Sequence, residues 1–304
     1  MDDSSHNTSE VSVSHDLTWG EVLVAIDLRP ASIAAATWIA TQLAPEARLT
    51  LVHCLEVPRP SSVLWDVLPS RDELVATLRA RVAERLEPVL ADGPLSRARV
   101  EVLAGHPGDE IALLAREAEA DLVVTGRHVG RRVGVLGSTA GRLVASCHRP
   151  VLMVREPPSG PPAVILVPVD DSQQAAKALS RALACGRRYG AEVVVYHAVT
   201  TWYFKRLREA DGEARAAELQ DRVVQRARAW LERLVAEHDT EGVEVRVELS
   251  SGSAGEQVLA AIERLGVDLV VTGSHGLESL YRTQEPHLSR HLLLAAPCSV
   301  LVIT

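Results

Sequence analysis

The sequence predicts an α/β protein made of two tandem doubly wound domains, each with a five-stranded, mainly parallel sheet. Three observations lead to this fold class. The 304 residues are enough for about two domains. The chain repeats itself with a period of about 145 residues. Within each copy, short apolar runs alternate with longer segments of helical periodicity.

The repeat is clearest in one octapeptide. DLVVTGRH at 121–128 matches DLVVTGSH at 268–275 in seven of eight positions. Other landmarks recur at similar spacing, such as the Asp that closes the first apolar run, Asp27 in one copy and Asp170 in the other. The two copies are therefore expected to share one fold and to pack against each other as an internal pseudo-dimer.

The strands are expected where Val, Leu and Ile form short, nearly continuous runs, as in strands buried on both faces. Helices between parallel strands make right-handed crossovers, which give a Rossmann-like sheet covered on both sides. The predicted strands are 21–27, 48–54, 98–103, 121–125, 150–154, 163–169, 192–198, 243–249, 268–272 and 299–303. The predicted helices are 31–44, 71–91, 108–118, 138–147, 172–189, 205–238, 255–265 and about 286–294.

Domain boundaries follow from composition. Residues 1–19 begin with a polar, acidic stretch and are predicted to be a disordered tail. The first domain spans 20–156 and the second 163–304, and residues 157–162, with four prolines and a glycine, form the linker.

The aromatic cluster at 202–204 precedes the long helix. We expect it to pack that helix on the sheet, the alternatives being a partner surface or the rim of an apolar pocket.

Composition excludes several classes of protein. A net charge of −8 and a pI near 5.8 argue against a general nucleic-acid binder. No apolar run is long enough to cross a membrane, and the N-terminus lacks the pattern of a signal peptide, so a cytoplasmic protein is expected. Only two lysines are present and no GxxxxGK[ST] motif occurs, which excludes a Walker-type NTPase.

Metal and catalytic sites find little support. The four cysteines lie far apart and form no CxxC motif. A metal or redox site that joins Cys147 and His148 to Cys298 is the weaker alternative to buried structural thiols. His53 and His197 are equivalent in the repeat, and we expect a structural or ligand-stacking role for them. No Ser-His-Asp arrangement is recognisable, so neither catalytic residues nor metal ligands are predicted.

Ligands of doubly wound sheets bind beyond the carboxyl ends of the strands. Asp27 and Asp170 follow the first strand of each copy and could accept hydrogen bonds from ribose hydroxyls. The alternative is that each caps the next helix.

The fourth strand of each copy leads into a glycine-containing loop. Such loops bring backbone N–H groups close to phosphate, and the helix that follows favours anions at its N-terminus. A crossover loop with ordinary capping is the alternative. The candidate residues in copy one are Gly126, Arg127, His128, Gly130, Gly137, Ser138 and Thr139, and in copy two Gly273, Ser274, His275 and Gly276. In copy two, Pro286-His287 replaces Gly137-Ser138, so copy two is predicted to be the poorer phosphate site.

These features resemble the universal stress proteins (UspA-like domains) in their tandem two-domain form. The resemblance is carried by Asp27 and Asp170, by Gly105-His106-Pro107, by the DLVVTG runs and by the terminal APCSVLV at 296–302. It implies a non-enzymatic stress-response protein in which, by analogy with dimers of the family, the short apolar final strands of the two copies pair with each other. It also implies that ATP, with Mg²⁺, would be bound through a G-x2-G-x9-G-[ST] loop.

Neither copy has the whole loop motif. Copy one has Val129 at the second glycine and is two residues short, whereas copy two ends in Pro286-His287. A degenerate adenine-nucleotide site in copy one is the favoured expectation. The alternatives are a slow Mg²⁺-dependent ATP hydrolase and a binder of another small molecule or lipid fragment. A homodimer and an unidentified regulatory protein are the expected partners.

Overall fold

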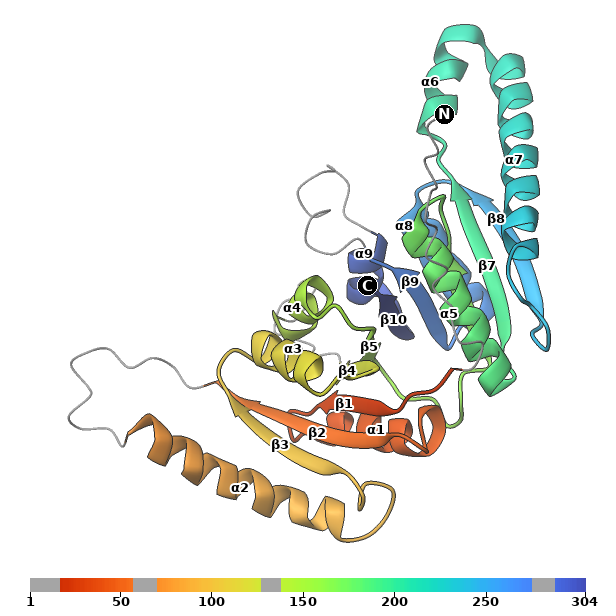
Figure 1. Cartoon of the computed structure of the whole chain (residues 1–304). Coiled ribbons are helices and arrows are strands. Elements are labelled where there is room, and N and C mark those ends of the chain that lie inside the picture. The colour runs from red at the N-terminus through yellow and green to blue at the C-terminus, as the bar shows by residue number, and fades with distance from the viewer. Residues whose placement is uncertain (1–16, 57–69, 127–137, 275–287) are drawn as a thin grey trace, which may run out of the picture.

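The computed structural model describes residues 17–56, 70–126, 138–274 and 288–304. These residues form one ten-stranded sheet with helices on both faces (Figure 1). The strand order is β3-β2-β1-β4-β5-β10-β9-β6-β7-β8, so the second half mirrors the first. This order confirms two doubly wound halves and joins their sheets into one.

The first half contains five strands and the helices between them. Its elements are β1 Glu21–Ala25, α1 Pro30–Trp38, the π-helical η1 Ile39–Leu43, β2 Arg48–Leu55, α2 Arg71–Ala91, β3 Arg99–Ala104, α3 Pro107–Glu117, β4 Leu122–Gly126, α4 Ser138–Ser146 and β5 Val151–Val154. The helix predicted over 31–44 is therefore α-helical only as far as Trp38.

The second half repeats this pattern of alternating strands and helices. Its elements are β6 Val164–Pro168, α5 Gln173–Tyr189, β7 Glu192–Val199, α6 Trp202–Asp211, α7 Glu213–Ala236, β8 Val245–Ser251, α8 Ala254–Leu265, β9 Leu269–Gly273, α9 Leu288–Ala295 and β10 Ser299–Ile303. All strands within each half pair in parallel.

The two halves join through their last strands. β5 and β10 pair antiparallel, with Leu152 opposite Leu301. Every residue of both strands is buried, so pairing covers two apolar edges that would otherwise be exposed. The predicted edge pairing and the intramolecular pseudo-dimer are both confirmed.

Burial is divided between the two faces of the sheet. On one face, α1, α2, α5 and α7 cover a core that runs through both halves, with members such as Val22 and Leu51 from the first and Val193 and Leu269 from the second. On the other face, α3 and α4 cover one cluster, whereas α8 and α9 cover another that also includes Met153 of β5.

The Asp that opens each DLVVTG run ties two strands together at their starts. Oδ2 of Asp121 accepts hydrogen bonds from the backbone N–H groups of Gly20 (2.8 Å) and Glu21 (2.9 Å). Asp268 does the same for Ala163 (2.8 Å) and Val164 (3.1 Å). The repeated Asp is thus structural and lies at the opposite end of the strands from the predicted ligand site.

The predicted tail extends too far into the folded chain. Leu17 and Trp19 are each only 5% exposed and belong to the core that runs through both halves. Arg188 donates to the carbonyl of Leu17 at 3.2 Å, and the Arg181 guanidinium lies 5.2 Å from the centre of the Trp19 ring. The segment is ordered from residue 17 because its apolar side chains are buried against α5.

The prediction of one helix over 205–238 is also wrong. Gly212 has φ +87°, which breaks the segment into α6 and α7, and the aromatic cluster forms the first turn of α6 rather than preceding it. The two helices form a hairpin that projects from one end of the molecule (Figure 1). Phe204 is buried and Tyr203 is 53% exposed. None of the described helices is long and apolar enough to span a membrane.

Candidate functional site

Beyond the carboxyl ends of β1 and β4 lies the predicted ligand site of the first half. Because Ala25 pairs with Thr125 in the sheet, Asp27 and Gly126 leave the sheet at the same end of neighbouring strands. The side chain of Asp27 is about half exposed, at 45%. The structure therefore brings together two of the residues that the sequence selected.

Asp27 shapes the turn before α1 but does not cap that helix. Its Oδ1 accepts the N–H of Arg29 at 3.1 Å, and its Oδ2 lies 3.5 Å from the Arg29 guanidinium. Leu28 between them has φ +62°, a left-handed conformation that costs a non-glycine residue free energy. The N-cap position belongs to Arg29, which makes no side-chain capping bond.

A histidine on β2 holds the end of β1 in place. Nδ1 of His53 lies 2.9 Å from the carbonyl oxygen of Ile26, the residue before Asp27. A carbonyl can only accept, so Nδ1 carries the proton in this pair. His197 repeats the contact at 2.8 Å to Val169, next to Asp170. This geometry supports the structural role, with Trp230 as a further ring contact of His197 at 5.2 Å.

The far side of the site is the N-terminus of α4, where the backbone helix begins at Ser138 and continues through Thr139. Nη1 of Arg142 donates to both carboxylate oxygens of Asp109, at 2.7 and 3.0 Å, and this ion pair fixes α4 against α3. The predicted loop residues Arg127, His128, Gly130 and Gly137 lie outside the described residues.

The second half is arranged differently at the equivalent position. Asp170 accepts both the N–H of Ser172, at 3.0 Å, and the hydroxyl of Ser172, which in turn caps α5 by accepting the N–H of Ala175 at 3.1 Å. Ser274 donates its N–H to Ile303 at 2.8 Å, which leaves one fewer backbone donor for a phosphate. His275 and Gly276 lie outside the described residues.

Gly126 at the end of β4 and Gly273 at the end of β9 are equivalent in the repeat but differ in the space around them. A Cβ built on Gly126 meets no described atom within 4 Å. A Cβ built on Gly273 lies 2.7 Å from the backbone carbon and oxygen of Gln174, in the first turn of α5. Among the described residues, the crevice between β4 and α1 is therefore open in copy one, whereas the crevice between β9 and α5 is filled in copy two.

The cysteines are free thiols, of which Cys147 and Cys185 are buried and Cys54 and Cys298 are partly buried. Burial raises the pKa of Cys54 to about 11 and that of Cys298 to about 12, and it also raises the pKa of Cys147. Thiols with raised pKa values are poor nucleophiles and poor metal ligands at neutral pH. Among the described residues, no three His, Cys, Asp or Glu side chains are grouped as a metal site would require.

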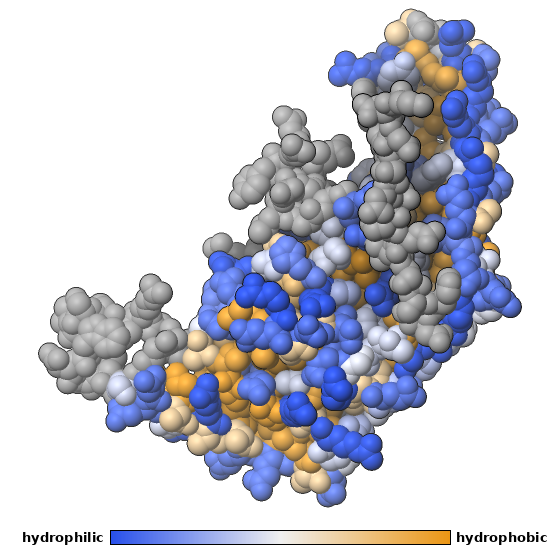
Figure 2. Space-filling view, in the orientation of Figure 1, coloured by the Kyte–Doolittle hydropathy of each residue, from blue (hydrophilic) through white to orange (hydrophobic). Residues whose placement is uncertain are grey.

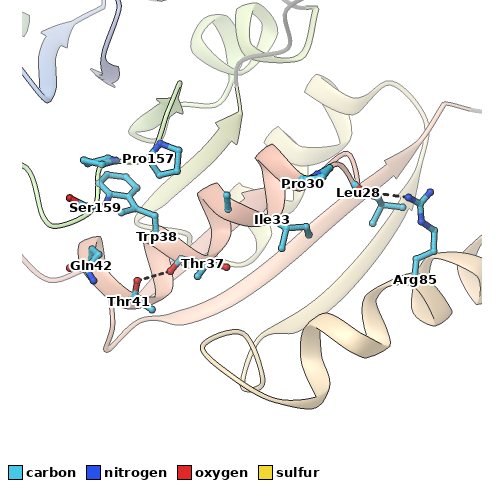
Figure 3. Close-up of a pocket in the computed structure, with 12 residues that line it drawn as sticks. Leu28, Pro30, Ile33, Thr37, Trp38, Thr41, Gln42, Arg85, Pro157 and Ser159 are labelled. Carbon is cyan, nitrogen blue, oxygen red and sulfur yellow. Dashed lines mark hydrogen bonds between the residues drawn. The ribbon is translucent and has the colours of Figure 1, made fainter.

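One cavity was not anticipated from the sequence. A groove of about 700 Å³ runs along the outer face of α1 and η1, between α2 and the linker (Figure 3). Its lining includes Trp38, Arg85 and the linker residues Pro157 and Pro158. A sequence signal that could have indicated it is the excess of apolar residues along α1, although Ile33 and Trp38 also pack in the core.

Comparisons with known proteins agree with this architecture. The model of the "Universal stress protein family" matches residues 18–155 and 163–304. The chain is 23% identical over 148 residues to universal stress protein Sll1388 of Synechocystis, an alignment that covers 46% of this chain and 96% of that protein.

Among solved structures, a universal stress protein from Archaeoglobus fulgidus aligns with TM-score 0.68 and 20% identity, over 94% of this chain and 98% of the other. A functionally unknown protein from Pseudomonas aeruginosa aligns with TM-score 0.55 and 17% identity, over 93% of this chain and 92% of the other. Both structures share the fold of the whole described chain, including its two halves.

Proposed function

Because the chain belongs to the universal stress protein family, we propose that it is a non-enzymatic stress-response protein whose first half binds an adenine nucleotide. The site lies between the ends of β1 and β4 and the start of α4. It comprises Asp27, Gly126 and the segment that leads to Ser138 and Thr139.

The observation that carries this proposal is the open space at Gly126. A nucleotide needs room beside strand four if backbone N–H groups are to approach its phosphates. Copy one provides that room, whereas Gln174 occupies it at Gly273 in copy two. The proposal therefore assigns the nucleotide to copy one, in the half whose loop ends in Gly137-Ser138.

The described residues of copy one fit an adenine nucleotide. The half-exposed carboxylate of Asp27 is an acceptor suited to ribose hydroxyls. The start of α4 would offer backbone N–H groups and the positive end of a helix dipole to the phosphates. Bound Mg²⁺ would neutralise phosphate charge.

Calorimetric titration of ATP with Mg²⁺ into the full chain tests the proposal. We expect one binding event per chain. Asp27→Ala should weaken binding by at least about tenfold, as the loss of hydrogen bonds to a charged group predicts. Gly126→Val, which fills the open space, should also weaken it. The matched control Asp170→Ala should leave the Kd unchanged.

Two outcomes would contradict the proposal. The absence of any heat of binding in the wild-type chain would exclude the nucleotide site. An effect of Asp170→Ala equal to that of Asp27→Ala would exclude the assignment to copy one. Steady phosphate release above a no-protein control, abolished by Asp27→Ala, would show that the protein is a hydrolase instead.

A further inference from the structure

The groove along α1 is elongated and mainly apolar. It extends from Leu28 and Pro30 at one end to Gln42 and Ser159 at the other. The helix between Pro30 and Gln42 makes it roughly 17 Å long, at about 1.5 Å per residue. Figure 2 shows hydrophobic surface over this part of the first half, between α1 and α2. Its volume of about 700 Å³ is within the range of small-molecule sites.

Two of the polar groups that line the groove already have partners within the protein. The indole N–H of Trp38 donates to the carbonyl of Gly160 at 2.9 Å, which fixes the linker as one wall. The hydroxyl of Thr41 donates to the carbonyl of Thr37 at 2.9 Å, within the helix (Figure 3). Because these donors are already used, the wall favours an apolar ligand over one that needs hydrogen bonds along its length.

A single positive charge lies at one end of the groove. Arg85 of α2 reaches the Leu28 carbonyl at 3.5 Å, the long limit of a hydrogen bond (Figure 3). An Arg side chain has five N–H donors, so most remain for a ligand. Among the described residues, Arg85 has no carboxylate partner, and no acidic side chain lines the groove. An apolar wall with one cation at its end is complementary to an amphipathic anion.

The second half shows that the fold does not require this apolar surface. α5 is the repeat counterpart of α1, and Lys177 and Arg181 stand where α1 has Ala34 and Trp38. Arg181 is stacked on Trp19 rather than lining a groove. The apolar face of α1 is thus a property of copy one alone.

We propose that this groove binds a long-chain carboxylate, with the acyl chain along α1 and the carboxylate on Arg85. The linker supplies the wall opposite the helix through Pro157 and Pro158. This site is separate from the proposed nucleotide site, because it lies on the outer face of α1 and uses neither Asp27 nor Gly126.

The test is calorimetric titration of the full chain with dodecanoate, below its micelle concentration, and with dodecanol. We expect binding of dodecanoate at one per chain and weaker binding of the uncharged alcohol. Arg85→Gln should raise the Kd for dodecanoate about tenfold, as the loss of a charge-assisted contact predicts. Ala34→Glu, at an exposed position of a helix, should abolish binding by adding bulk and negative charge to the groove.

Two controls match these variants. Arg116→Gln removes the same charge from α3, on the opposite face of the sheet, and Lys177→Glu introduces the same residue at the equivalent site of α5. Both should bind dodecanoate like the wild type. Circular dichroism checks that each variant is folded. If Ala34→Glu does not fold, the Kd of Arg85→Gln alone tests the proposal.

The result that overturns the proposal is no binding of dodecanoate by the wild type. Equal affinity for dodecanoate and dodecanol, or an unchanged Kd in Arg85→Gln, also overturns it. ATP titration of Arg85→Gln keeps the two sites distinct, because nucleotide binding should persist whether or not the groove binds a carboxylate.

Discussion

The indole N–H of Trp19 donates to the hydroxyl of Tyr189 at 3.1 Å, across 170 positions of sequence. That hydroxyl donates in turn to the carbonyl of Leu43 at 2.8 Å. Trp19 and Leu43 belong to the first half and Tyr189 to the second. One phenol therefore connects the segment before β1 and the end of η1 to α5. Burial raises the pKa of Tyr189, which keeps the phenol protonated and able to donate at any physiological pH.

Removing this hydroxyl should weaken the junction between the halves. Tyr189→Phe leaves the Trp19 N–H and the Leu43 carbonyl unpaired in a part-buried site, so the free energy of unfolding should fall by about 1–3 kcal/mol. Urea denaturation of Trp19→Phe, Tyr189→Phe and the double variant measures the effect. A coupling energy of about 1 kcal/mol is expected for residues in direct contact. Strict additivity of the two substitutions would contradict the connection.

A second contact joins the end of β5 to α9 of the other half. The Arg155 guanidinium donates to the carbonyls of Ala295 and Ala296, at the C-terminus of α9. A cation there satisfies unpaired carbonyls and the helix dipole.

Arg155→Met should therefore lower the free energy of unfolding by about 1 kcal/mol. Thermal and urea unfolding measure the loss, and Arg155→Lys should recover part of it. The matched substitution Arg226→Met, at an exposed position in the middle of α7, should have little effect. Equal effects at the two positions would show that the charge matters and the helix end does not.

Much of this architecture could be predicted from the sequence because it depends on local pattern. The buried runs and the repeat predict the strands and their parallel order within each half. The pairing of the two final strands was expected from the family resemblance, and its antiparallel sense is seen only in the structure. The break at Gly212 was missed because the amphipathic pattern continues through it, and only the φ of +87° distinguishes a hinge from a tolerated helical glycine. The predicted tail of residues 1–19 is too long because Leu17 and Trp19 are buried through contacts with α5, which is distant in sequence.

The candidate site could be predicted only in part. Asp27 and Gly126 could be predicted as site residues because each lies at the end of a strand, and the apolar pattern of the sequence locates the strand ends. The open crevice at Gly126 and the filled one at Gly273 depend on how closely α1 and α5 approach strand four, and that is a property of packing. The groove depends on the linker folding back onto Trp38, which no local pattern encodes.

The buried thiol of Cys185 predicts a loss of stability at alkaline pH. Burial raises its pKa from 9.0 to about 12, although Arg181 and Arg188 oppose the shift. Because the folded pKa is above the unfolded one, the stabilising contribution is complete below pH 9 and is lost as pH rises toward 12.

The wild type should therefore lose more stability than Cys185→Ala between neutral pH and pH ~10.5. The difference should be about 2 kcal/mol, at about 1.4 kcal/mol per pH unit. Urea denaturation of both proteins at the two pH values measures it, and subtraction removes the titration of Tyr189 that both share. Parallel pH profiles for the two proteins would show that Cys185 ionises in the folded state as readily as in the unfolded chain.

The difference between the two strand-four glycines gives the most direct comparison of the copies. A Cβ at Gly273 would lie 2.7 Å from the backbone of Gln174, which cannot move without displacing the first turn of α5. Gly273→Ala should therefore lower the free energy of unfolding by about 1–3 kcal/mol. A Cβ at Gly126 meets no described atom within 4 Å, so Gly126→Ala should change it by less than about 0.5 kcal/mol. Urea denaturation of the two variants gives both values. Equal destabilisation would mean that α1 closes on strand four as α5 does. That result would remove the structural basis for assigning the nucleotide to copy one.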